Sequence, residues 1–139
     1  MDEKNVLEKN EPLRKNHWLL KFPSDLEINE CECDSAELPT CYFENGKKIW
    51  TPIMVSYNQF ENCTVAKSLM KWCNSLEADK EKNKRDLEID LLDGIGGLLT
   101  KWIIKGASIK SIHYGSLSYN DYGILTLQVD LNYDDAFIE

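Results

Sequence analysis

Few residues of this chain combine types and spacings that could do chemistry. A serine nucleophile needs a histidine nearby as its base, and with only two histidines among 139 residues the one close pairing is Ser111 with His113. On a strand these side chains project to the same side, but neither a strand-to-helix elbow nor a third member of a triad accompanies them. We therefore expect no catalytic residues and no enzymatic activity.

The five cysteines, at positions 31, 33, 41, 63 and 73, do not have the spacing of a metal site. Cys31 and Cys33 are separated by a single residue, and no second pair follows to complete a zinc site. The odd number, without an apolar secretion signal at the N-terminus, is typical of reduced thiols. We expect neither a metal site nor a cofactor.

Residues 93–97 (DGIGG) are similar to a phosphate-binding loop. Such a loop needs a helix directly after it, because the N–H groups at the helix start hold the phosphate. Residues 98–102 (LLTKW) resume a β pattern instead. We therefore predict a β-turn at this position.

Acidic residues outnumber basic ones, with 24 Asp and Glu against 16 Lys and Arg and a formal net charge of −8. This balance argues against nucleic-acid binding, which depends on clustered lysine and arginine. Asp86, Glu88 and Asp90 alternate with leucine and isoleucine, which predicts one acidic side of a strand rather than a calcium loop. Their mutual repulsion costs stability unless they face bulk water. Two surfaces satisfy this condition: the outer face of a monomer, or the solvated wall of a channel built from many copies.

The remaining pattern predicts a mainly β domain with one α-helix. Apolar alternation predicts strands at residues 17–22, 28–36, 53–57, 87–91, 98–105, 109–114 and 125–133. The Asn45-Gly46 dipeptide predicts a hairpin turn. Apolar residues at positions 65, 69, 72 and 76 form one stripe, which predicts a helix over about 65–78. Because no helices connect the later strands, we expect a mostly antiparallel β-sandwich or barrel with the helix packed on it.

We expect a single domain at residues 16–139, preceded by a flexible or docking arm at 1–15. A charged linker is expected at 79–85, after the helix. Residues 41–62 are expected to form a loop, and this loop carries five aromatic residues: Tyr42, Phe43, Trp50, Tyr57 and Phe60. They pack either against a neighbouring copy or back onto the domain's own core. No apolar run approaches the length of a membrane span, so we expect no contact with a membrane and no export by an N-terminal signal.

Five segments of the second half form an ordered series: residues 90–93 (DLLD), 101–107 (KWIIKGA), 109–112 (IKSI), 115–119 (GSLSY) and 129–134 (VDLNYD). The series resembles the tail tube proteins of contractile-tailed bacteriophages, which carry a W-x-[IL]-x-G-[CA] strand between an acidic turn and a closing strand that ends in a tyrosine. Phe22, the Leu38-Pro39 pair and Trp72 fit the first half of that family more loosely. Lys110 stands where the family often has proline.

The resemblance implies a structural virion protein of the phage tail. Copies of a small β-sandwich or barrel with a flanking helix would join edge to edge into a hexameric ring, and rings would stack into a tube. Partners would be further copies and the tail sheath, tape-measure and baseplate proteins, with genomic DNA passing through during ejection without specific binding. Asp86, Glu88, Asp90 and Asp130 would face an acidic lumen that repels DNA phosphates, and the aromatic residues of 41–62 would form a ring-stacking contact.

Three alternatives stay open. One is a tube-initiator or baseplate protein of the same fold, and another is a ring protein of a contractile injection or secretion system. Outside that class, the chain would be a monomeric β binding module.

Overall fold

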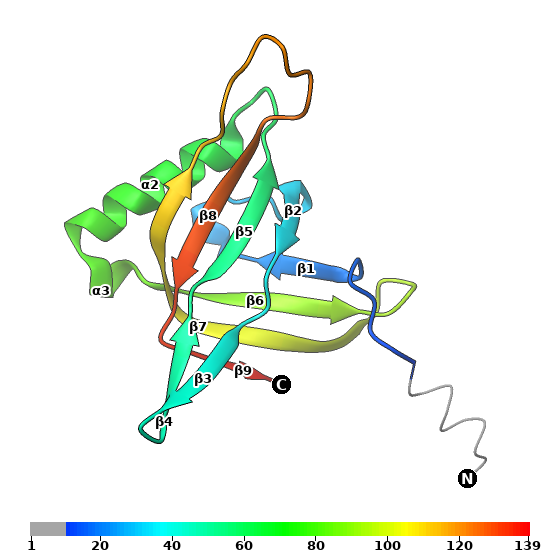
Figure 1. Cartoon of the computed structure of the whole chain (residues 1–139), viewed down its shortest axis with the longest axis vertical. Coiled ribbons are helices and arrows are strands. Elements are labelled where there is room, and N and C mark those ends of the chain that lie inside the picture. Colours follow the sequence, from blue (N-terminus) through cyan, green and yellow to red (C-terminus); the bar gives the residue numbers. More distant parts are fainter. Residues whose placement is uncertain (1–10) are drawn as a thin grey trace.

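The computed structural model describes residues 11–139 (Figure 1). Residues 1–10, most of the predicted N-terminal arm, lie outside the described residues. The described chain contains nine strands: β1 (Trp18–Lys21), β2 (Cys33–Ala36), β3 (Thr40–Glu44), β4 (Lys47–Thr51), β5 (Ile53–Asn58), β6 (Arg85–Leu92), β7 (Leu98–His113), β8 (Thr126–Asn132) and β9 (Asp135–Ile138). The main helix is α2 (Thr64–Ala78), followed by the short α3 (Lys80–Asn83); η1 (Ser24–Leu26) and η2 (Glu30–Glu32) are single 3-10 turns. The predicted mainly β fold with one main helix is confirmed.

Seven strands form one continuous sheet in the order β1-β6-β7-β8-β5-β2, with β9 also paired to β7. Every pairing is antiparallel, as predicted. The first half of β7 pairs with β6 and β9, and its second half pairs with β8. We call β1, β6, β9 and the first half of β7 sheet A, and the second half of β7 with β8, β5 and β2 sheet B. The strands of sheet A run across those of sheet B (Figure 1).

Strand β7 joins the two sheets without a break, although the sequence predicted two strands separated at Gly106. This glycine has a φ of +66°, and a Cβ atom at its position would overlap the Asp134 carboxylate. The left-handed backbone conformation that glycine tolerates therefore redirects the strand instead of ending it. A register shift between Ile109 and Ser111 adds to the irregularity of β7 beyond this point.

The core lies between the inner faces of the two sheets and helix α2. Its largest fully buried side chains come from all three layers: Leu20, Leu87 and Ile104 of sheet A, Ile53, Leu127 and Leu131 of sheet B, and Leu69 and Trp72 of α2. The indole Nε1 of Trp72 donates to the Asn83 carbonyl oxygen over 2.9 Å. The stripe at 65, 69 and 72 therefore faces the core, and the helix begins one residue before the predicted start.

Two of the predicted connections are wrong in detail. Residues 41–62 are not a loop, because β3 and β4 form a two-stranded hairpin sheet and β5 lies inside sheet B between β8 and β2. The Asn45-Gly46 turn is right, and both residues have positive φ. The expected linker at 79–85 contains α3, because the Asp79 carboxylate caps it by accepting from the Lys82 N–H, 3.2 Å away.

Candidate assembly surfaces

The predicted acidic row is a real feature of strand β6. Asp86, Glu88 and Asp90 point away from the core, while Leu87 and Ile89 between them are buried. Each carboxylate, however, forms an ion pair with a lysine on a neighbouring strand. The row therefore exposes far less negative charge than its sequence suggests.

The three ion pairs tie β6 to both of its neighbours. Lys105 of β7 lies 3.0 Å from Asp86, and Lys101 of β7 lies 3.7 Å from both Glu88 and the Glu139 side chain. Lys21 of β1 lies 2.9 Å from Asp90. The sequence carried a signal for these partners, since Lys101 and Lys105 are four residues apart on the following strand and therefore lie on the same face of it.

The carboxylates of the row differ in their surroundings. The pKa of Asp86 is lowered because the Gly106 N–H donates to its side chain and Lys105 is paired with it. Asp90 is buried, with 5% of its surface exposed, and the bond to Asp90 raises the pKa of Lys21. The Asp90 carboxylate is therefore largely shielded from solvent in the subunit.

Asp130, the fourth predicted lumen residue, lies on a different sheet. It sits on β8 of sheet B, opposite Met54 of β5, and its Oδ2 accepts from the Ser111 hydroxyl over 3.1 Å. The structure therefore does not bring the four predicted carboxylates into one row.

The predicted aromatic contact residues separate into three environments. Tyr42 and Phe43 lie on the β3–β4 hairpin and are exposed, Phe43 by 71%. Phe60, in the connection between β5 and α2, is half exposed. Tyr57 contradicts the prediction: it is completely buried, because it lies on the inward face of β5 within the core, where the Phe22 ring centre is 6.5 Å from its own.

Trp50 attaches the hairpin to the body of the domain. Its indole Nε1 donates to Asp135 over 3.2 Å, and its ring centre lies 5.7 Å from that of Tyr133. The Lys48 ammonium group sits 5.4 Å from the centre of the same ring. Figure 1 shows the hairpin projecting beyond the end of sheet B. The apolar groups of its outer part are therefore available to another molecule.

Sequence reasoning missed a second exposed apolar segment, the loop of residues 114–125 between β7 and β8. Its most exposed large side chains are Leu117, Tyr119, Tyr122 and Ile124, with exposures of 87%, 101%, 95% and 72%. Clusters of this kind on a folded domain mark contact surfaces. Aromatic residues in a stretch rich in glycine and serine, with no strand alternation, were the signal available in the sequence.

The side chains and the loop that the sequence offered as possible chemical sites form ordinary structural hydrogen bonds. The Ser111 hydroxyl donates to Asp130, and His113 Nδ1 accepts from the Gly115 N–H. Residues 93–97 form the predicted turn, in which the Asp93 carboxylate accepts from the Ile95 and Gly97 N–H groups. Between residues 11 and 139, no three His, Cys, Asp or Glu side chains lie where they could hold a metal ion together.

Two of the thiols, those of Cys33 and Cys73, lack the environment of reactive sites. All five are free. Burial raises the pKa of Cys33 to about 12, and its Sγ donates to the Ser35 and Ser56 carbonyl oxygens over 3.6 Å. Burial likewise raises the pKa of Cys73. Burial therefore disfavours the thiolate form of both side chains.

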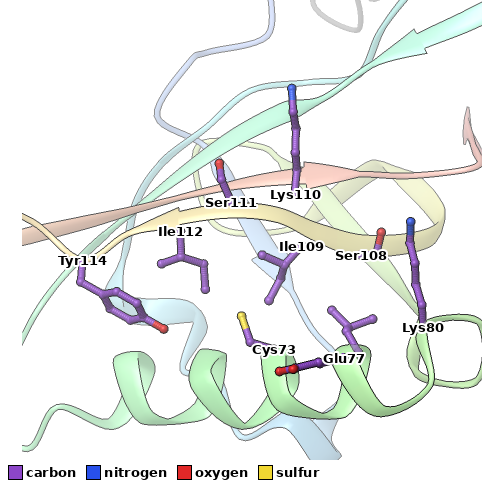
Figure 2. A pocket seen from close by; sticks show the side chains of 10 residues that line it. Cys73, Glu77, Lys80, Ser108, Ile109, Lys110, Ser111, Ile112 and Tyr114 are labelled. Atoms are coloured by element: carbon purple, nitrogen blue, oxygen red, sulfur yellow. The ribbon is translucent and has the colours of Figure 1, made fainter.

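Cys73 lines a cleft of about 470 Å³ between α2 and the second half of β7 (Figure 2). Ile109, Ile112 and Tyr114 point from β7 toward the helix, while Lys110 points away from it. No strand pairs with this side of β7 between residues 108 and 113 in the part of the chain that the structure describes. The cleft therefore runs beside a free sheet edge.

None of the described helices is long and apolar enough to span a membrane.

No protein-family model and no curated protein matches the sequence, but several solved structures share the fold. One is a chain in the anti-feeding prophage cap, the tube terminating cap, with a TM-score of 0.70 and 18% identity over 94% of this chain and 92% of that chain. Another is in the extended sheath–tube complex of the extracellular contractile injection system PVC, with a TM-score of 0.70 and 17% identity over 100% and 99% of the two chains. The Hcp1 protein of E. coli EAEC 042 has a TM-score of 0.60 and 11% identity, covering 88% and 95%. The tail-tube resemblance is confirmed at the level of the fold.

Proposed function

We propose that this chain is a structural, ring-forming subunit of the tube of a contractile injection apparatus. The observation that carries the proposal is the likeness of the whole fold to chains of tube and tube-cap assemblies, at a TM-score of 0.70 over 94–100% of this chain. The sheath–tube complex is that of an extracellular contractile injection system, and Hcp1 of E. coli shares the fold. The class is therefore broader than phage tails, and a virion tail is one setting within it. The fold likeness also favours a non-enzymatic role.

The topology of sheet B supports closure into a ring. Within residues 11–139, this sheet has a free edge on each side, at β2 and at the second half of β7. Its four strands alternate in direction, so β2 runs antiparallel to β7. Copies placed side by side in the same orientation would therefore bring β2 of one copy against β7 of the next in an antiparallel pair. Such pairing would remove both exposed edges, and we propose six copies in each ring.

Ring closure through sheet B would place the outer face of this sheet on the lumen, because the core, α2 and sheet A all lie behind its inner face. The outward side chains of β5 and β8 are mostly polar and uncharged: Ser56, Asn58, Thr126, Gln128 and Asn132, with Asp130 the one acid among them. Of the four predicted lumen carboxylates, Asp130 would then be the one in the channel. Lys110 of β7 points away from α2 and therefore to the same side (Figure 2). The wall would be polar with few charges and would hold a passing polymer weakly, and in a phage tail that polymer would be DNA.

The test is the mass and shape of the purified full chain, by light scattering and negative-stain microscopy. We expect rings with a central hole that stack into tubes, together with sheath, tape-measure and baseplate proteins as partners in the complete particle. A compact monomer of 16.1 kDa at high protein concentration would contradict the proposal and return the chain to the class of monomeric binding modules.

A second candidate is a terminal ring, either a cap or a tube-initiating baseplate ring. The specific observation is that the fold matches a tube terminating cap as well as it matches the sheath–tube complex. The same microscopy separates the two roles, because a terminal ring would form rings that do not stack.

A further inference from the structure

The loop 114–125 is held firmly at its base while its apolar side chains are uncovered. The Gln59 side chain donates to the Tyr114 carbonyl oxygen over 2.7 Å, and the Gln59 N–H donates to the Leu125 carbonyl oxygen over 2.9 Å. Farther out, the Asp121 carboxylate accepts from the Gly123 N–H over 2.8 Å. The loop thus presents its aromatic groups from a defined backbone instead of burying them.

This loop and the β3–β4 hairpin lie at opposite ends of the same strands. The hairpin leads into β5 at Ile53, which pairs with Leu131 at the end of β8. The loop leads into β8 at Thr126, which pairs with Asn58 at the other end of β5. Figure 1 shows the loop at the top of sheet B and the hairpin at the bottom. Along the strand direction, each subunit therefore has one exposed apolar element at each end.

We propose that the β3–β4 hairpin of one copy packs on the loop 114–125 of the next copy along the tube. The inference rests on the proposed function and names the partner of each surface. A head-to-tail contact between two different surfaces repeats without closing, which is the geometry of a filament. Tyr42 and Ile49, which are paired on one face of the hairpin, would bury against the exposed aromatic groups of the loop.

Charge favours this head-to-tail pairing over the symmetric ones. The only ionised side chain within 114–125 is Asp121. The outer part of the hairpin carries Lys47 and Lys48 against one acid, Glu44, and is therefore net positive. Packing loop on loop would oppose two aspartates, and packing hairpin on hairpin would oppose two lysine pairs. Packing hairpin on loop brings opposite charges together around an apolar centre.

The experiment measures ring formation and ring stacking separately, by sedimentation velocity and by stack lengths in negative stain. The first variant is Ile124→Ser combined with Tyr122→Ser in the exposed loop. Ile95→Ser is the matched control, because Ile95 is also an exposed loop isoleucine but lies at the tip of sheet A. We expect intact rings whose association with one another weakens on the order of tenfold or more in the loop variant, and unchanged stacking in the control.

A charge exchange tests whether the two surfaces meet. Lys47→Glu and Asp121→Lys should each shorten the stacks, and the two changes made in the same chain should restore them in part. Lys47 is preferred to Lys48, because Lys48 also covers Trp50. Restoration requires the two side chains to be close across copies.

Each outcome decides a different question. Rings whose stacking resists the loop changes, or responds equally to Ile95→Ser, would overturn the hairpin–loop contact and leave the ring-forming function standing. Shortened stacks without recovery in the charge exchange would also overturn the pairing of these two surfaces. A wild-type chain that forms no rings would overturn the proposed function itself, and the contact with it.

Discussion

The carboxylate of Asp90 is buried beside the ammonium group of Lys21, 2.9 Å away, and this pair joins strand β6 to the edge strand β1. The Oδ1 atom of Asp90 has no hydrogen-bond partner among the described residues. Lys21 is therefore the main group that compensates a charge removed from water. The contact holds together two strands, β1 and β6, that lie far apart in the sequence.

Lys21→Met should destabilise the fold more than a surface lysine change does, because it leaves the Asp90 carboxylate buried without its partner. Urea unfolding followed by circular dichroism measures the effect. Lys67→Met on the exposed side of α2 is the matched control. Adding Asp90→Asn to Lys21→Met should recover stability, and a double variant no more stable than Lys21→Met would contradict the role given to the buried charge.

Asp86 should contribute to acid sensitivity. Its pKa is held below the usual 3.8 by the Gly106 N–H and by Lys105, so the carboxylate adds stability above pH 3.8 that is lost as the pH falls through the lowered pKa. The difference in unfolding free energy between the wild type and Asp86→Asn should shrink below pH 3.8. A difference that stays constant down to pH 2 would show that the carboxylate is not linked to folding.

Native cysteine labelling should divide the thiols by exposure. Cys31, Cys41 and Cys63 are exposed and should react with iodoacetamide in the folded protein. Cys33, with a pKa near 12, should be labelled only after unfolding. Mass spectrometry of peptides reads each position, and labelling of Cys33 at the rate of Cys31 would contradict the buried position of Cys33.

Asp34→Pro should block ring formation while leaving the subunit folded. Asp34 lies in the register shift of β2 between Cys33 and Ser35, outside the paired positions, where proline is tolerated in a sheet. Proline has no N–H and its ring hinders the addition of a strand. Light scattering should give monomers for Asp34→Pro and rings for Asp34→Ala. Rings in both variants would mean that β2 is not the joining edge.

Trp72→Ala should be the most damaging single change in the helix. The side chain is 1% exposed, contacts Phe22 edge to face and donates to Asn83. Truncations of this kind cost about 3–5 kcal/mol. Met70→Ala on the same helix, half exposed, should change the free energy of unfolding by less than about 0.5 kcal/mol. Equal losses of unfolding free energy for the two variants would contradict the orientation of α2, with Trp72 facing the core and Met70 facing outward.

The features that were predicted correctly depend on residues that are close together in the sequence. The stripe at 65, 69 and 72 follows from helical geometry, and the Asn45-Gly46 turn follows from the backbone conformations that these two residues tolerate. Neither requires knowledge of which strands pair. The apolar faces of β6 and β8 were visible for the same reason, because alternation is a property of a single strand.

The misplaced residues depend on pairings between distant segments. Tyr57 is buried because the inward face of β5 packs against core side chains from distant segments, among them Phe22 and Trp72. The neutralisation of Asp90 depends on the register that places Lys21 of β1 beside it. Asp130 and Asp86 carry the same charge on similar strands, and only the change of strand direction at Gly106 puts them on different sheets.

The order of strands along the chain also determines which strand pairs can form first during synthesis. During synthesis, β3 and β4 can pair as soon as the Asn45-Gly46 turn leaves the ribosome, whereas β1 must wait for β6 and β5 must wait for β8. Long-range pairings of this kind form slowly. The hairpin thus exists on the nascent chain before the sheet behind it is complete, and a hydrophobic strand such as β5 depends on the last quarter of the protein for its cover.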